Sequence, residues 1–148
     1  MQEEGTHFGI DIVFEFGTPV LAAAPGRILR SYGEPFFGNT MVVEHGPDPT
    51  GKRIRTYYRH LQERIAKVGD VVQRGEQIAK LGATGVWSGG FPHLHFEVHR
   101  HIEKDVFRPV DPHLLWANGV GKVTCLDAGH MIPDLPVQTT YPVPCTGR

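Results

Sequence analysis

Two segments of the chain combine histidines with acidic residues at spacings that could hold a metal ion. His7 and Asp11 lie in "HFGIDI", and four of the nine histidines lie at alternate positions of "FPHLHFEVHRH", beginning with His93 and His95. Imidazole nitrogen and carboxylate oxygen are ligands of Zn²⁺, and catalytic zinc sites use three protein ligands and leave a position for water. His7, Asp11 and one of His93 and His95 would supply such a set.

The spacing of His7 and Asp11 limits how the two residues can act together. "HFGIDIVFEF" alternates polar and apolar residues, which predicts a β-strand with both side chains on one face. In a straight strand their Cα atoms lie ~13 Å apart, too far for easy binding of one ion. Both could reach the same ion if the strand bends or ends at Gly9, since glycine permits such a change of direction. Taken alone, the segment is equally well explained as a polar face toward solvent.

His93 and His95 lie on the most regular of the predicted strands. Their Cα atoms would be ~6.6 Å apart on one face, so both imidazoles can approach one small volume, as two ligands or as a ligand and its neighbour. The other face would anchor the strand in the core through Leu94, Phe96 and Val98.

The polar face of this strand continues beyond His95. Glu97 shares it, and two interpretations stay open, a residue that supports a metal ligand or a solvated carboxylate. His99 and His101 follow at about 13 Å and further along the strand, out of reach of the same ion. We expect both of these histidines at the surface or in a groove wall.

Most of the remaining sequence predicts short strands joined by tight turns. "NTMVVEHG" and "RIRTYYRHL" flank "GPDPTGK", a loop of turn residues, which is typical of a hairpin. Eighteen glycines and twelve prolines suit such a chain better than a helical bundle. The expected fold class is all-β and mainly antiparallel.

The composition is that of a soluble globular domain. The chain has 148 residues, of which 40% are hydrophobic and 21% charged, and its net charge of -1 gives no argument for a nucleic-acid partner. It has no apolar run of about 18 residues, so we expect no membrane span. The segment "MQEEGTHFGID" lacks the pattern of a signal peptide, so we expect either a cytoplasmic protein or a trimmed piece of a longer one.

The character of the chain changes after residue 117. Glycine and proline recur from Asn118 onward, which predicts an extended arm over residues 118–148, either laid over the domain of residues 1–117 or partly mobile. Cys125 and Cys145 both lie in this arm. They would form a disulfide in an oxidising compartment, with a stabilisation of roughly 3 kcal/mol, or remain two thiols.

The order of the motifs resembles that of LytM/lysostaphin-type zinc endopeptidases. "HFGIDI", "TYYRHL", "VGDVVQRGEQIAKLGATG" and "PHLHFEV" follow one another as they do in that family, and the resemblance extends from about His7 to Trp116. Each motif alone is common, whereas His-x-x-x-Asp together with His-x-His in this framework is specific. His60 in "TYYRHL" acquires a possible function only in this context.

The resemblance implies a fold, an activity and a role for five residues. His7, Asp11 and His95 match the family's zinc ligands, and His60 and His93 match the two unliganded histidines beside the metal-bound water, with their individual roles left open. The fold would be a compact β-sandwich or barrel-like structure with a duplicated hybrid motif and an open groove. The substrate would be the peptide crosslinks or bridges of bacterial peptidoglycan, so the protein would be periplasmic, or secreted and active at the cell wall.

The chain departs from the family pattern at its beginning. Only six residues precede His7, whereas family members usually have a loop there that forms one wall of the groove. The arm could replace that wall, bind a partner or simply trail. A second set of possible groove walls consists of aromatic residues in glycine-rich loops, for which packing is the equally good alternative: Phe36, Phe37, Trp87 and Phe91.

Two other functions compete with hydrolysis. Some relatives have lost metal ligands and activate other cell-wall hydrolases, but all five expected positions are present here. The segment "VGDVVQRGEQIAKLG" also resembles the hairpins of biotinyl or lipoyl carriers, and the family's fold is shared with a phosphotransfer domain. No lysine stands at a hairpin tip in a modification motif, which disfavours a carrier.

Overall fold

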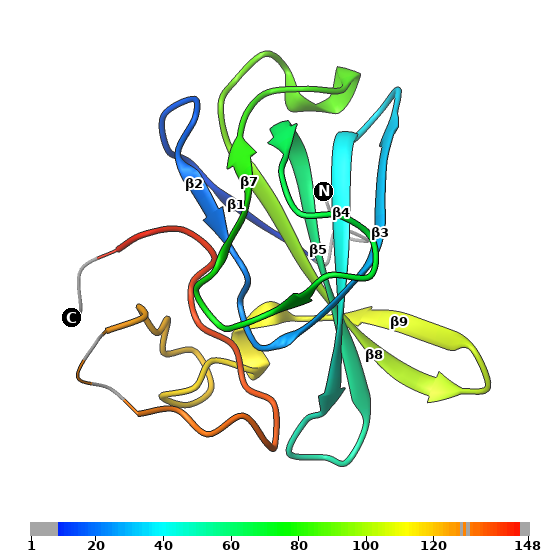
Figure 1. Ribbon diagram of the computed structural model, residues 1–148, viewed down its shortest axis with the longest axis vertical. Coiled ribbons are helices and arrows are strands. Elements are labelled where there is room, and N and C mark those ends of the chain that lie inside the picture. The colour runs from blue at the N-terminus through cyan, green and yellow to red at the C-terminus, as the bar shows by residue number, and fades with distance from the viewer. Residues whose placement is uncertain (1–8, 128, 130, 146–148) are drawn as a thin grey trace.

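The structure is a computed structural model that describes residues 9–127, 129 and 131–145 (Figure 1). Within these residues the chain forms a nine-stranded sheet in which every pairing between named strands is antiparallel. The predicted all-β, antiparallel fold is confirmed. The strands are β1 (Ile10–Ile12), β2 (Pro19–Leu21), β3 (Gly26–Glu34), β4 (Gly38–Pro47), β5 (Arg53–Arg64), β6 (Val71–Val72), β7 (Gln77–Leu81), β8 (Leu94–Glu103) and β9 (Val106–Val110).

The strand order explains how distant segments meet. Hydrogen-bonded neighbours in the sheet follow the order β1-β8-β5-β4-β3-β6. In addition, β7 pairs with both β2 and β5, and β9 pairs with β8. Two short 3-10 helices, η1 (Val86–Ser88) and η2 (Pro112–Leu114), are the only helices in the described part of the chain. Neither is long and apolar enough to cross a membrane. Strand β8 lies between β1, the first strand of the described residues, and the central β5.

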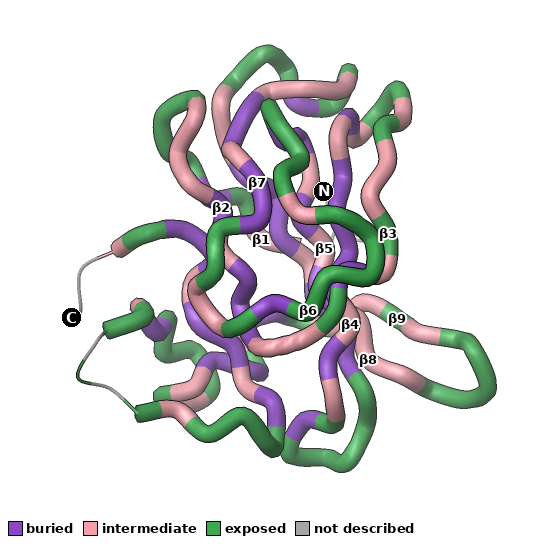
Figure 2. Tube along the Cα trace, viewed as in Figure 1, coloured by how far each residue is buried: buried purple, intermediate pink, exposed green. Residues whose placement is uncertain are grey.

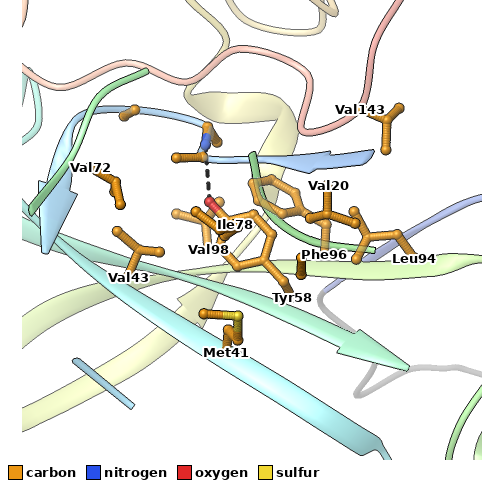
Figure 3. Close-up of a cluster of buried hydrophobic side chains, with 14 of the residues drawn as sticks. Val20, Met41, Val43, Tyr58, Val72, Ile78, Leu94, Phe96, Val98 and Val143 are labelled. Carbon is orange, nitrogen blue, oxygen red and sulfur yellow. Dashed lines mark hydrogen bonds between the residues drawn. The ribbon is translucent and has the colours of Figure 1, made fainter. Parts of the chain in front are cut away.

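The core follows from the alternation along β5 and β8. Ile54 and Tyr58 on β5 are fully buried, as are Phe96 and Val98 on β8, and these side chains pack together with residues of β2 and β4 (Figure 3). Because side chains alternate between the two faces of a strand, the residues between them lie on the opposite face. Figure 2 shows that β4 and β7 are mostly buried, whereas the hairpin of β8 and β9 ends in an exposed turn.

A chain of hydrogen bonds crosses the core. The backbone N–H of Ala23 donates to the Tyr58 hydroxyl at 3.0 Å (Figure 3). The oxygen of the same Tyr58 hydroxyl lies 2.8 Å from that of the Thr56 hydroxyl. His45 Nε2 lies 2.7 Å from the same Thr56 hydroxyl, and its Nδ1 donates to the carbonyl of Pro25 at 2.7 Å. The chain is complete when Tyr58 donates to Thr56, Thr56 donates to His45, and His45 is neutral with its hydrogen on Nδ1.

The described part of the C-terminal arm packs against the sheet. Val137 and Val143 belong to the same core as the strands, and Cys125 and Cys145 form a disulfide. The arm also forms backbone hydrogen bonds with the body of the domain, including one from Thr140 N–H to the carbonyl of Ala23 at 2.9 Å. In Figure 1 the red part of the arm passes the end of β2, where Leu21 N–H donates to the carbonyl of Pro142 at 2.8 Å.

Candidate metal centre

Asp11 and His95 meet because β1 pairs with β8. The antiparallel register places them directly opposite each other, and Asp11 Oδ1 lies 2.9 Å from His95 Nδ1 although 84 residues separate them in the sequence. His93 joins them from the residue before the start of β8, with its Nε2 3.8 Å from Asp11 Oδ1. The pairing of β1 with β8 thus brings together three of the five predicted site residues, and His60 on β5 is the fourth. His7 lies outside the described residues.

Gly9 allows β1 to approach this edge. A Cβ atom at Gly9 would lie 2.6 Å from Cε1 and Nε2 of His95 and 2.9 Å from Cγ of Glu97, which is too close for any side chain. Strand β1 begins at Ile10, directly after Gly9, so the strand end that the spacing of His7 and Asp11 requires is present. The backbone of Gly9 therefore lies against the imidazole of His95.

His60 reaches the site through an unusual backbone conformation. By alternation it would share the core face of β5 with Thr56 and Tyr58, but its φ is 67°, a left-handed conformation that is uncommon outside glycine. Its ring centroid lies 4.8 Å from that of His93 and 6.2 Å from that of His95. The backbone thus directs a side chain that strand alternation assigns to the core toward the other histidines.

The two histidines beside the proposed ligands are oriented in the same way. His60 Nδ1 donates to the carbonyl of Thr84 at 2.7 Å, and His93 Nδ1 donates to the carbonyl of Phe91 at 2.9 Å. Burial lowers the pKa of His60, the Thr84 carbonyl opposes this, and nearby His93 adds to the lowering. His60 is therefore neutral at neutral pH, with the lone pair on Nε2 available to accept a proton.

His95 is held between two carboxylates. Its Nδ1 faces Asp11, and its Nε2 lies 2.8 Å from Oε2 of Glu97. Burial alone would lower the pKa of His95, but the hydrogen bonds and charges of Asp11 and Glu97 outweigh it and raise the pKa. The two carboxylates therefore favour the protonated form of the ring.

The chemistry and spacing of these donors fit a zinc ion. Zinc bonds of about 2.0–2.1 Å in a tetrahedral site separate two ligand atoms by about 3.3 Å. Asp11 Oδ1 and His95 Nδ1, at 2.9 Å, need only a small displacement for an ion to replace the shared proton. No cluster of three or more His, Cys, Asp and Glu side chains within residues 9–145 described here is arranged to hold a metal by itself. The predicted third ligand, His7, precedes this range.

Two side chains that the sequence did not assign to the site, Glu97 and Phe37, contact His95, and two more, Arg59 and His99, contact Glu97. Glu97, which the sequence left as either a supporting or a solvated residue, binds His95 and also accepts from Arg59 and His99. Phe37 stacks on His95 with ring centroids 5.7 Å apart. Alternation along β8 identifies the face of Glu97 and His99, but nothing in the sequence predicts that Arg59 and Phe37 meet them.

A groove adjoins the three residues. A cavity of about 570 Å³ is lined by Asp11, Val13, Trp87, Ser88, Phe91, Pro92 and His93. Trp87 and Phe91 are 59% and 74% exposed, and Trp87 stacks on Phe36 at 4.7 Å. Two of the four aromatic residues from the glycine-rich loops, Trp87 and Phe91, thus line this cavity.

Comparison with known proteins identifies relatives of most of the chain. The model of peptidase family M23 matches residues 5–112. Peptidoglycan DD-endopeptidase ShyB of Vibrio cholerae is 39% identical over 92 residues, which are 62% of this chain and 20% of that protein. Lysostaphin of Staphylococcus simulans is 34% identical over 93 residues, 63% of this chain and 18% of that protein. The chain therefore matches about a fifth of the length of these curated relatives.

Solved structures resemble the fold as well. The catalytic domain of lysostaphin from Staphylococcus simulans has a TM-score of 0.59 at 33% identity, over 72% of this chain and 75% of that one. LytU has a TM-score of 0.61 at 31% identity, over 74% and 72% of the two chains. A zinc-containing peptidase from Vibrio cholerae has a TM-score of 0.58 at 37% identity and covers 71% of this chain and 29% of its own.

Proposed function

Because this chain belongs to peptidase family M23, we propose that it is a zinc-dependent endopeptidase that hydrolyses peptide crosslinks or bridges of bacterial peptidoglycan. The juxtaposition of Asp11 with His95, beside His93 and His60, is the observation that carries the proposal. ShyB and lysostaphin, a DD-endopeptidase and an antimicrobial peptidase by name, support the substrate class. Such a substrate implies action in the periplasm or at the cell wall.

In this proposal His7, Asp11 and His95 hold the ion. Asp11 Oδ1 and His95 Nδ1 offer one oxygen and one nitrogen 2.9 Å apart, and His7 precedes Gly9 on the same segment as Asp11. Zinc, when bound, would lower the pKa of its water toward about 7 and polarise the scissile carbonyl. We assign the chemistry to residues 1–117 and a supporting role to the arm of residues 118–148.

The unliganded histidines would move the proton and stabilise the oxyanion. His60 is neutral, and its hydrogen is held on Nδ1 by Thr84, so Nε2 can accept the proton of the attacking water and later deliver it to the leaving amine. His93 faces the groove beside Asp11 and can donate from Nε2 to the developing oxyanion when it carries a proton there. The lowered pKa of His60 supports this division of roles.

Digestion of purified peptidoglycan tests the function. We expect the purified chain to release soluble muropeptides, and mass analysis of two peptidoglycans with different crosslinks to identify the bond that is cut. EDTA should abolish the activity and added Zn²⁺ should restore it. His95→Ala should lose both zinc and activity, whereas His60→Ala should keep zinc and lose activity by about 100-fold or more. A metal-free protein that binds cell wall without cutting it would contradict the proposal and favour an activator of other hydrolases.

A further inference from the structure

Glu97 connects His95 to two other side chains on the same face of the sheet. Its Oε2 accepts hydrogen bonds from His95 Nε2 at 2.8 Å and from Arg59 Nε at 3.2 Å, and its Oε1 accepts one from His99 Nε2 at 2.8 Å. The Glu97 side chain is only 12% exposed. A nearly buried carboxylate thus contacts the side of the His95 ring that faces away from Asp11.

The register of β5 and β8 produces this arrangement. Arg59 lies opposite His95 in the antiparallel pairing, Tyr57 lies opposite Glu97, and Arg55 lies opposite His99. Residues at alternate positions of paired strands share one face, with directly opposite Cβ atoms about 4.5–5.5 Å apart. The contacts of Glu97 are therefore set by backbone pairing between two central strands and not by a loop.

Aromatic rings hold the partners of Glu97. The guanidinium carbon of Arg59 lies 4.0 Å from the centroid of Phe37, whose ring also stacks on His95. His99 stacks on Tyr57 with centroids 4.0 Å apart. Arg59 also supplies the positive charge that a poorly solvated carboxylate requires, since an unpaired buried charge is costly. The carboxylate therefore has a fixed position and a compensating charge.

The position of Glu97 determines which nitrogen of the neutral His95 ring carries the lone pair. While Nε2 keeps its hydrogen in the bond to Glu97, the lone pair of the neutral ring must be on Nδ1, the nitrogen that faces Asp11. Histidine ligands of metals commonly donate their other N–H to a carboxylate, which fixes the tautomer and the ring orientation.

We propose that Glu97 is the positioning residue of this metal centre: it holds the Nε2 hydrogen of His95 and thereby presents Nδ1 to the ion, while Arg59 and His99 orient the carboxylate. This inference rests on the proposed function. It means that the ion pair between Arg59 and Glu97 supports the metal centre as well as the pairing of β5 with β8.

Zinc affinity of Glu97 variants tests the proposal. The purified chain is titrated with Zn²⁺ against a chromophoric chelator, and circular dichroism melts verify that each variant is folded. We expect Glu97→Ala to bind zinc about 10–100-fold more weakly than the unmodified chain. In Glu97→Gln the amide oxygen can still accept from Nε2 but forms a weaker bond than a carboxylate, so a severalfold loss is expected. Glu103→Gln, which removes an exposed carboxylate from the same strand, is the matched control and should bind as the unmodified chain does.

Nitrogen-15 spectra of the histidine rings provide a second measurement. In the zinc-loaded unmodified chain the His95 hydrogen should be on Nε2, and in Glu97→Ala this preference should be lost.

Equal zinc affinity and an unchanged tautomer in Glu97→Ala would overturn the inference and leave the proposed function intact. If Glu97→Ala does not fold, unchanged affinity in Glu97→Gln overturns it. If Glu103→Gln weakened zinc binding as much as the Glu97 variants do, the effect would come from the net charge of β8, and the inference would be overturned as well. An unmodified chain that binds no zinc would contradict the proposed function itself, and the inference with it.

Discussion

At the scale of single residues, the close approach of Gly9 to His95 decides how the candidate centre is assembled. The imidazole has Asp11 on one nitrogen and Glu97 on the other, so it cannot turn away from a new neighbour without breaking one of these bonds. Gly9 is not required for a left-handed backbone here; it is required because the His95 ring occupies the space of a side chain.

Gly9→Ala should therefore impair the centre as well as the fold. The added methyl would meet the His95 ring at 2.6 Å, and such overpacking typically costs about 1–3 kcal/mol. Because the displaced ring is a proposed ligand, we expect a loss of zinc affinity of about 10-fold or more, measured by chelator competition. Gly129→Ala, where the added atom meets only Asp127 at 3.8 Å, is the control. Unchanged zinc binding in Gly9→Ala would show that the ring has room to move.

At the scale of the elements, β4 and β5 share a buried polar chain whose state depends on pH. His45 on β4 accepts from Thr56 on β5, and its own N–H is used by Pro25. Burial lowers the pKa of His45 to about 4, the Pro25 carbonyl opposes this, and the charge of Arg74 contributes to the lowering. Protonation of Nε2 would reverse the chain: Thr56 would accept from His45 and donate to Tyr58, and the Tyr58 hydroxyl hydrogen would lose Thr56 as its acceptor.

The stability of the domain should fall as the pH drops below about 6.5. In the unfolded chain His45 titrates near 6.5, whereas in the folded chain it stays neutral to about pH 4. The unfolded state therefore binds more protons in this window, and about 3 kcal/mol of unfolding free energy is lost between pH 6.5 and 4. Urea unfolding at several pH values measures the slope. His45→Gln should flatten it, and an equally steep slope in that variant would refute the assignment to His45.

At the scale of the whole molecule, the described part of the arm is part of the core. Val137 and Val143 are 1% exposed among strand residues, and Arg74 donates to Ala23 and Thr140 where the arm contacts the segment that follows β2. The disulfide closes this segment with a sequence separation of 20 residues. A loop of that size restricts the unfolded chain, so the bridge should stabilise the domain as a whole.

Removal of the disulfide should lower global stability without removing the metal centre. For a loop of this length the expected loss of unfolding free energy is about 3 kcal/mol. Thermal melts with and without a phosphine reductant measure it, and the double variant Cys125→Ser/Cys145→Ser should melt at the lower temperature in both conditions. The variant should still bind zinc below its melting temperature, because neither cysteine contacts Asp11, His93 or His95 among the interactions described above. Equal melting temperatures would mean that the bridge does not restrain the arm.

The sequence predicted what depends on local pattern. The alternation of "HLHFEV" predicted a strand with Phe96 in the core and His95 on the opposite face, and the structure confirms both. Motif order indicated the family, which the match over residues 5–112 shows. The pairing of the two cysteines stayed open because it depends on where the arm folds back, and the structure resolves it as a disulfide.

What the amino-acid sequence determined by itself is therefore the set of strands, their two faces and the family to which they belong, because periodicity and motif order are properties of neighbouring residues. Only the tertiary structure decided which faces meet. One strand pairing brings together Asp11 and His95, which are 84 positions apart in the sequence. His60 enters the site through a left-handed backbone, although strand alternation assigns its side chain to the core. Arg59 finds Glu97 because β5 pairs with β8 in one register. These contacts depend on hydrogen bonds and packing between segments far apart in the chain, so they cannot be predicted from the pattern of neighbouring residues.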